Sequence, residues 1–520
     1  MSGNISLFFL VCFPLLGSLL VYIIGRYDKT VRDYGVQFIC ICELLLFFGM
    51  LVQYLNQPIP LVFDLKDFCG MGLHLKMDGF RVLYGTIAAF MWALTSLLSK
   101  QYFGHYHNRN RYYFFFLVTL GATVGVFLSA DLYTTFIFFE MMSFTSYVWV
   151  VHDEKKESLR AGSTYLAVAV IGGLVMLMGL FLLYDTIGTL TISEIWPAVQ
   201  DGRKEMEKVI ASSSFVPESE MASGIKSLTE YQARLYAAGF CMLFGFGAKA
   251  GMFPLHGWLP TAHPVAPAPA SAVLSGVITK AGVLGIIRSV YYVAGPDMIK
   301  GTWVQYTWII LSILTIFMGS MMAYKEKVLK KRLAYSTVSQ VSYILFGLSV
   351  MQPIAFVGAL MHVIFHSLVK NTLFVSAGAI ICKTGKTKVR QLVGIGKEMP
   401  VTMWCFTLVS LTLIGIPPTS AFVSKWYLIS GALDSGIPGL SWVGPVVLLI
   451  SALLTAGYLL TISIKAFFPG EDYDYTKLVN HEPTWRMLLP MVVMTALAVI
   501  LGIWPSGLMK IFADIAASVL

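Results

Sequence analysis

Seven residues that can bind and release protons lie inside long apolar stretches of this chain, where a charge is costly. They are four lysines, a glutamate and two histidines: Lys249, Lys280, Lys370, Lys425, Glu140, His362 and His366. A solvated lysine, with a pKa of about 10.4, cannot release protons at neutral pH, but burial disfavours its charged form. A structural ion pair or a lysine reaching the membrane surface would explain one such residue. Because the cost recurs at every position, the set as a whole indicates a proton relay.

The two histidines and Lys370 form a stripe. His362, His366 and Lys370 are spaced four residues apart, which places them on one face of a helix over about 12 Å. This spacing suits proton carriers with water between them, although isolated histidines also hydrogen-bond neighbouring helices. The segment HVIFH has the spacing of two zinc ligands but lacks the glutamate of HExxH, so we predict no metal site.

Helix-breaking residues interrupt the apolar stretches that carry Lys249 and Lys425. Proline removes a backbone donor and clashes with the preceding turn. Paired interruptions in corresponding halves of a membrane protein indicate a transport site. The predicted breaks are at Gly251, Pro254, Gly415, Pro417 and Pro418.

The composition requires a membrane. Of 520 residues, 57% are hydrophobic and 12% are charged, against about 25% charged in soluble proteins. These values exclude a soluble enzyme and a DNA-binding module. A helix needs about 20 apolar residues to cross the hydrocarbon core. We predict fourteen spans, near 5–25, 34–54, 80–103, 112–129, 131–151, 160–184, 235–262, 266–293, 303–324, 335–351, 354–382, 400–433, 443–468 and 485–504.

Basic residues are distributed unevenly between the loops. Of the 37 lysines and arginines, 22 lie on the side away from the termini, 11 on the side of the termini and four within spans. Positive residues concentrate in cytoplasmic loops. We therefore predict a multi-pass protein of the cell membrane with both termini outside the cytoplasm. The net charge of +9 then needs no nucleic-acid partner.

The two interrupted spans run in opposite directions, which predicts two inverted repeats of five helices, each with one broken helix. The predicted fold class is an all-α polytopic membrane protein with about fourteen transmembrane helices. The expected organisation is three N-terminal helices (1–111), a first repeat (112–293) with an exterior polar loop (185–234), a second repeat (303–468), and a last helix with a short amphipathic tail (485–520).

Five blocks between residues 75 and 470 resemble a known family of antiporter-like membrane subunits. The family comprises the proton-translocating subunits of respiratory complex I, of energy-converting hydrogenases and of Mrp-type sodium/proton antiporters. The resemblance implies fourteen helices, inverted five-helix repeats and a water-filled half-channel in each repeat. The blocks are FFEMMSFTSY, GAKAGMFPLHGWLPTAHPVAPAPASAVLSGVITKAG, KKRLAYSTVSQVSY, HVIFHSLVKNTLF and GIPPTSAFVSKWYL.

These observations lead to one hypothesis for function. The chain is a proton-translocating, or sodium-linked, channel subunit of a multisubunit complex, and Glu140 is a switch that holds or frees the proton of Lys249. The expected partners are other membrane subunits and lipid. No cofactor is expected, so any redox step belongs to another subunit. The expected order of proton transfer is Lys249, Lys280, His366, His362, Lys370 and Lys425.

Several alternatives remain open at this stage. A stand-alone secondary transporter of a small solute, or a redox subunit that holds haem or quinone, would share the composition. The sequence does not distinguish protons from sodium ions, or hydrogenase from antiporter or quinone reductase. Glu43 lies inside the second span and outside the family pattern. It is expected to face a neighbouring subunit or to be neutral and hydrogen-bonded.

Overall fold

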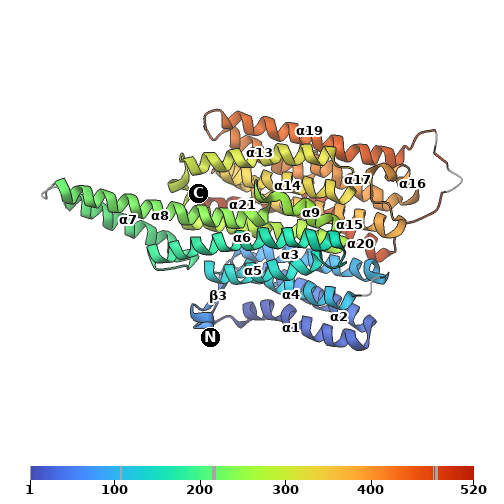
Figure 1. The fold of residues 1–520 in the computed structure, drawn as a ribbon, viewed down its shortest axis with the longest axis horizontal. Coiled ribbons are helices and arrows are strands. Elements are labelled where there is room, and N and C mark those ends of the chain that lie inside the picture. The colour runs from blue at the N-terminus through green and yellow to red at the C-terminus, as the bar shows by residue number, and fades with distance from the viewer. Residues whose placement is uncertain (1, 106–107, 213–217, 472, 475–477) are drawn as a thin grey trace.

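The computed structural model describes residues 2–105, 108–212, 218–471, 473–474 and 478–520. Long helices run roughly parallel and form one bundle (Figure 1). A hairpin of α7 (Ile192–Ser212) and α8 (Glu218–Ala250) projects beyond the other helices at the left of the figure. The labels of both chain ends lie toward this same end. The expected exterior segment 185–234 thus contains α7 and the beginning of α8.

The N-terminal half holds most of the helices that surround Lys249. Two π-helical segments continue α10 and α11, so that residues 268–294 form one unbroken rod. The remaining elements are α1 (Ile5–Tyr27), α2 (Lys29–Asn56), η1 (Phe68–Gly70), α3 (Gly79–Tyr102), η2 (Phe103–His105), α4 (Arg109–Leu128), α5 (Leu132–Val150), α6 (Lys156–Ile187), η4 (Leu255–Gly257), α9 (Trp258–Val265), α10 (Ala268–Val273), η5 (Leu274–Ile278), α11 (Thr279–Ile287), η6 (Arg288–Ala294) and α12 (Pro296–Ile299).

The C-terminal half contains the helices around Lys425. Its last helix has the amphipathic pattern expected for the tail, since Phe512 and Ala516 are buried whereas Lys510 and Asp514 are exposed. The elements are α13 (Trp303–Lys325), α14 (Leu329–Ser349), α15 (Pro353–Thr384), η7 (Val389–Leu392), α16 (Ile395–Glu398), α17 (Pro400–Ile414), α18 (Ser420–Leu433), α19 (Leu440–Phe467), α20 (Trp485–Ile503) and α21 (Ser506–Val519).

Eleven helical segments of the described residues are long and apolar enough to cross a membrane. Three other expected spans coincide with α5, with α14 and with the broken pair α17 and α18. Hydroxyl side chains make α5 and α14 less apolar, and the break shortens α17 and α18. A membrane protein built from helices is therefore confirmed, whereas fourteen crossings and the inverted repeats remain predictions.

A small antiparallel sheet was not foreseen from the sequence. Its strands are β1 (Ser2–Gly3), β2 (Leu61–Leu65) and β3 (Leu73–Met77), with Phe63 opposite Leu75. The signal was the alternation in LHLKM, where Leu73, Leu75 and Met77 are buried. Five residues are too few to stand out between long apolar runs.

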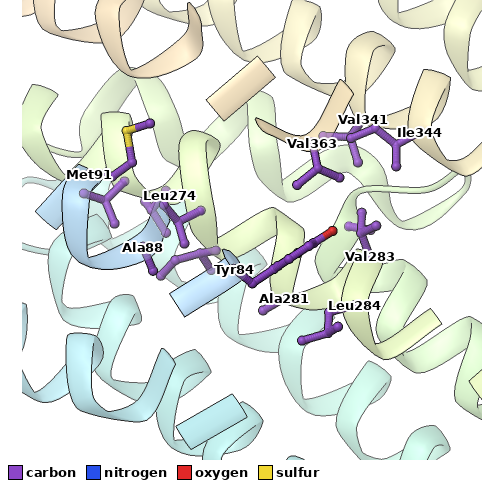
Figure 2. Close-up of a cluster of buried hydrophobic side chains, with 14 of the residues drawn as sticks. Tyr84, Ala88, Met91, Leu274, Ala281, Val283, Leu284, Val341, Ile344 and Val363 are labelled. Carbon is purple, nitrogen blue, oxygen red and sulfur yellow. The ribbon is translucent and has the colours of Figure 1, made fainter. Parts of the chain in front are cut away.

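An apolar cluster fills the middle of the bundle. Figure 2 shows Tyr84, Ala88 and Met91 of α3 meeting residues of the 268–294 rod, of α14 and of α15. All these side chains are buried. The cluster matters for function because it separates α3 and its N-terminal neighbours from the polar residues between α11, α14 and α15. The labelled residues from the rod, α14 and α15 are Leu274, Ala281, Val283, Leu284, Val341, Ile344 and Val363.

Candidate functional site

Lys249 is held by hydroxyl groups from two neighbouring helices. Its Nζ donates to Ser143 Oγ of α5 at 3.0 Å and to Tyr165 OH of α6 at 2.7 Å. Placing a lysine at the membrane centre costs about 2.5–3.5 kcal/mol. A hydrogen bond to a charged group contributes about 1.5–3 kcal/mol. The two bonds therefore offset the cost of burying this ammonium group.

A small cavity lies against Lys249. Phe139, Ser143, Tyr165, Gly245 and Trp258 are among the residues that line it. Its free space of about 10 Å³ has room for about one water molecule. Such a site suits a proton that leaves or reaches Lys249 through water.

Glu140 is not paired with Lys249 in this structure. Among the described residues no ion pair within 4.0 Å joins the two side chains, and the buried Glu140 Oε1 has no hydrogen-bond partner. The carboxylate lies instead against Gly173 of α6, where a Cβ would be 2.5 Å from Oε1. Glu140 and Lys249 were expected side by side, and the structure shows them in the separated arrangement.

We expect Gly173→Ala to lower proton translocation while the protein stays folded. The new methyl group forces the flexible Glu140 carboxylate to move, and alanine favours the helix by about 1 kcal/mol over glycine. Glu140→Gln, which removes the charge without moving the backbone, should have the larger effect. Proton pumping by the purified complex in proteoliposomes measures both. Gly239→Ala in α8 is the control, because a Cβ there meets nothing within 4 Å. Full activity of both the Gly173 and Glu140 variants would show that the carboxylate is only structural.

The first helix break lies directly after Lys249. Helix α8 ends at Ala250, and Gly251 has a left-handed φ of +80° that a residue with a side chain adopts only with strain. Trp258 Nε1 donates to Ala248 O at 2.9 Å, which satisfies one carbonyl near the end of α8. The interruption predicted from glycine and proline is therefore present, and it exposes the end of a helix beside the lysine.

Lys425 caps the other broken helix. Its Nζ donates to Leu413 O at 2.6 Å and to Ile414 O at 3.0 Å, at the C-terminus of α17. Gly415 follows with a φ of +91°, and a Cβ there would be 3.0 Å from the Lys425 Cδ. The end of a helix carries partial negative charge. The break therefore creates a local environment that favours a cation at Lys425.

The middle of the site joins ionisable groups directly. Lys280 Nζ lies 2.7 Å from His366 Nδ1 and also donates to Ser275 O at 2.5 Å. The rings of His366 and His362 stack with centroids 6.0 Å apart. Lys280 is on α11 and both histidines are on α15, and all three are buried. The structure thus brings together residues that are more than eighty positions apart in sequence.

His362 connects this middle to the region of Lys425. Its Nδ1 lies 2.9 Å from Ser424 Oγ and its Nε2 lies 3.2 Å from Gln340 Oε1. The ring of Tyr343 stacks on His362 at 5.7 Å, and Lys425 Nζ lies 5.0 Å from the centre of the same ring. His362 and Lys425 thus share the ring of Tyr343 as a neighbour, and Ser424, the partner of His362, precedes Lys425 in sequence.

From the sequence, Lys370 was expected between His362 and Lys425. In the structure it lies on a branch, away from these two residues. Its Nζ donates to Leu333 O at 3.1 Å and to Ser336 Oγ, both near the start of α14. The stripe on α15 is present, but its Lys370 end contacts α14, whereas its His362 end contacts Ser424 of α18. Spacing along one helix could not show which neighbouring helix each member contacts.

The hydrogen bonds do not form one continuous chain. Lys249 and Lys280 have different partners, and none of the bonds between described residues joins them. Their helices nevertheless pack closely, since a Cβ at Gly282 of α11 would lie 2.6 Å from Ala250 N. Among the described residues, Lys249 and Lys280 are therefore not connected by hydrogen bonds, although their helices are in close contact.

Several polar residues of the site were missed from the sequence. Ser143 and Tyr165 hold Lys249, and Ser424 holds His362. The clearest missed signal lies in the block KKRLAYSTVSQVSY, where Ser336, Gln340 and Tyr343 lie on one face of α14. This face meets the His362–His366–Lys370 stripe of the antiparallel α15. Serine and glutamine also occur in ordinary helix contacts, so their types alone gave no reason to select them.

Residues 129–455 match the model of the family described as NADH:quinone oxidoreductase/Mrp antiporter, transmembrane region. The chain belongs to this family of antiporter-like membrane subunits. It is 32% identical over 410 residues to an NADH-quinone oxidoreductase subunit of Desulforudis audaxviator, covering 76% of this chain and 75% of that one. It is 31% identical over 397 residues to a Na⁺/H⁺ antiporter subunit of Alkalihalophilus pseudofirmus, covering 76% of this chain and 73% of that one. Hydrogenase-4 component B of Escherichia coli is 28% identical over 460 residues, covering 84% and 63%.

Solved structures show the same fold. A chain of the archaeal membrane-bound sulfane sulfur reductase superposes with a TM-score of 0.84 at 20% identity, covering 99% of this chain and 98% of that one. A chain of the Mrp complex from a Dietzia species superposes with a TM-score of 0.80 at 21% identity, covering 98% of this chain and 97% of that one. A chain of respiratory complex I from Thermus thermophilus gives 0.78 at 19% identity, covering 99% and 100%. The resemblance inferred from the five sequence blocks is thereby confirmed.

Proposed function

We propose that this chain is a proton-translocating subunit of a multisubunit membrane complex, in which other membrane subunits supply the driving reaction. The observation that carries the proposal is the 2.7 Å contact of Lys280 Nζ with His366 Nδ1. It links an ionisable group of α11 directly to one of α15 inside an apolar bundle. Family membership supports the same conclusion, because the relatives are subunits of a quinone reductase, an antiporter and a hydrogenase.

The geometry supports a stepwise transfer of protons. With Glu140 withdrawn, only hydroxyl groups hold Lys249, and its proton can pass to water in the adjoining cavity. Lys280 accepts a proton from water and hands it to His366, and the stacked His362 continues the path toward Ser424 and Lys425. The return of Glu140 to Lys249 then favours reprotonation, since an opposite charge stabilises the ammonium form.

The branch at Lys370 gives this proposal a specific test. We expect His366→Ala to stop proton pumping by the intact complex, because it removes the side chain that hydrogen-bonds to Lys280 Nζ. Lys370→Ala should leave part of the activity, since the path from His366 through His362 to Ser424 remains. Pumping and sodium movement are followed together in proteoliposomes. Equal, complete losses in both variants would favour the linear order expected from the sequence. Normal pumping by the His366 variant would refute the proposed path.

We place both termini outside the cytoplasm, on the basis of the 22 to 11 distribution of basic residues between the two sides. Alkaline phosphatase, which is active only outside the cytoplasm, should therefore be active when fused after Leu520. The same enzyme inserted between α13 and α14, at Glu326, should be inactive. The reverse result would invert the orientation and with it the direction of every proposed transfer.

A further inference from the structure

Glu43 is a buried carboxyl group that the proposed relay does not use. It lies near the middle of α2, and its side chain is 0% exposed. Neither carboxyl oxygen has a hydrogen-bond partner among the described residues. Of the two expectations from the sequence, contact with a neighbouring subunit is excluded by the burial, and a hydrogen bond to the protein is not present.

Among the described residues, no charged group lies within ion-pair distance of Glu43. The titratable groups next to it are the thiols of Cys40 and Cys42 on the same helix. None of the ion pairs between described residues includes Glu43. An unpaired charge at membrane depth is costly. A neutral carboxylic acid avoids this cost, and its buried polar atoms still require partners such as water.

Polar groups lie between Glu43 and the side of the bundle where α2 begins. Cys40, one turn before Glu43, lies against the hydroxyl of Ser96 on α3. Ser99 is one turn closer to the end of α3, and the buried hydroxyl of Tyr112 on α4 lies next to it, without a hydrogen bond within 3.5 Å to any described residue. These groups come from three helices, and each can bind water or pass a proton.

The groups of Cys40, Ser96, Ser99 and Tyr112 form a row of polar groups. A buried ionic cluster lies at the end of this row that is nearest to the start of α2. Arg32 and Asp33 form an ion pair at 2.7 Å, and Arg109 lies 3.6 Å from the other oxygen of Asp33. The Arg32 guanidinium lies 5.1 Å from the ring centre of Tyr113, whose hydroxyl is also buried and without a partner. The polar groups therefore end at a buried ion-pair cluster near the start of α2.

Toward the relay, the surroundings of α3 are apolar. A neighbouring face of α3 carries Tyr84, Ala88 and Met91 into the apolar cluster of Figure 2. This cluster lies between α3 and the helices of the Lys280 and His366 pair. The row of polar groups is thus separated from the relay.

We propose that Glu43 is a second proton-binding site, separate from the relay, which exchanges its proton with the Arg32 side of the membrane along Cys40, Ser96, Ser99 and Tyr112. The site is blind-ended. Its proton enters and leaves by the same route, and ordered water completes the steps between the side chains. This inference does not rest on the proposed function, since it requires no transport through the relay.

Infrared spectroscopy of the full chain in lipid tests the proposal. An undissociated carboxylic acid has a C=O stretching band that a carboxylate lacks, and this band shifts when the acid proton is replaced by deuterium. At neutral pH we expect a band that is present in the wild-type protein and absent from Glu43→Gln. On transfer to D₂O the band should shift rapidly. Tyr112→Phe should slow this shift by about tenfold or more, as a barrier increase of about 1.4 kcal/mol would.

Tyr84→Phe is the matched control. Tyr84 also has a buried hydroxyl without a partner, but it belongs to the apolar cluster and not to the row. Its variant should exchange at the wild-type rate. Absence of the band from the wild-type protein would overturn the proposal, because Glu43 would then be ionised. A band that does not shift in D₂O, or that shifts equally fast in Tyr112→Phe, would also overturn it.

Discussion

Replacing Lys249 with alanine is expected to abolish proton translocation through this subunit while the protein remains folded in its complex. The lysine is the ionisable group at the first helix break, and among the described residues its ammonium hydrogen-bonds to the hydroxyls of Ser143 and Tyr165. Neither hydroxyl can replace a group that binds and releases a proton at neutral pH. Positioned proton-transfer groups contribute about 10²–10⁴-fold to a rate. Pumping should therefore fall to about a hundredth or less, measured in proteoliposomes that contain the whole complex.

Two further variants separate chemistry from structure in this experiment. Lys465→Ala removes an exposed lysine at the end of α19 and should pump normally. Tyr165→Phe keeps Lys249 but removes its 2.7 Å hydrogen bond, so it should reduce pumping less than Lys249→Ala does. Normal proton transport by an assembled Lys249→Ala complex would show that Lys249 has only a structural role and would remove the first half of the relay.

The helices and their interruptions could be predicted from the sequence because their causes are local. Long apolar runs specify membrane helices, and glycine and proline interrupt them wherever they fall. Gly251 and Gly415 both have the left-handed backbone that ends a helix. The ionisable residues were also identifiable, since they lie within long apolar stretches; the four lysines and two histidines are buried, whereas Glu140 is only partly buried.

The contacts between these residues could not be predicted, because they depend on how helices are rotated against each other. The stripe on α15 specified one face, but only the structure shows that Lys370 contacts α14 near Ser336 whereas His362 contacts Ser424. The position of Glu140 against Gly173 depends in the same way on the packing of α5 against α6. A period of 3.6 residues gives the face of a helix and not its neighbour.

The unpaired Glu140 has a consequence for the mechanism. The charges of Glu140 and Lys249 already interact at a distance in this arrangement, and a direct ion pair would require the carboxylate to leave its position against Gly173 or the lysine to move. An electrostatic change at α5 or α6 can therefore alter the affinity of Lys249 for its proton without a change in the helix break itself. A partner subunit that contacts this side of the bundle could control the first transfer in this way.

Lys425→Arg is expected to stop translocation although it preserves the positive charge. Arginine stays protonated at every accessible pH, so it can cap α17 but cannot pass on a proton. The carbonyls of Leu413 and Ile414 would still find a donor, and the fold should be retained. Pumping in proteoliposomes, with electron transfer or sodium exchange followed in parallel, should fall to about a hundredth or less.

Two other substitutions at Lys425 identify what the position requires. Lys425→Ala removes both the charge and the cap, and it should also stop translocation while leaving Lys249 bound to Ser143 and Tyr165. Lys425→Glu should retain part of the activity if proton exchange is the requirement, since a carboxylate can still bind and release a proton. Its negative charge next to the C-terminus of α17 is unfavourable, which limits that activity. Full pumping by Lys425→Arg would refute a protonation cycle at this residue and would leave a fixed positive charge at the end of α17 as its only role.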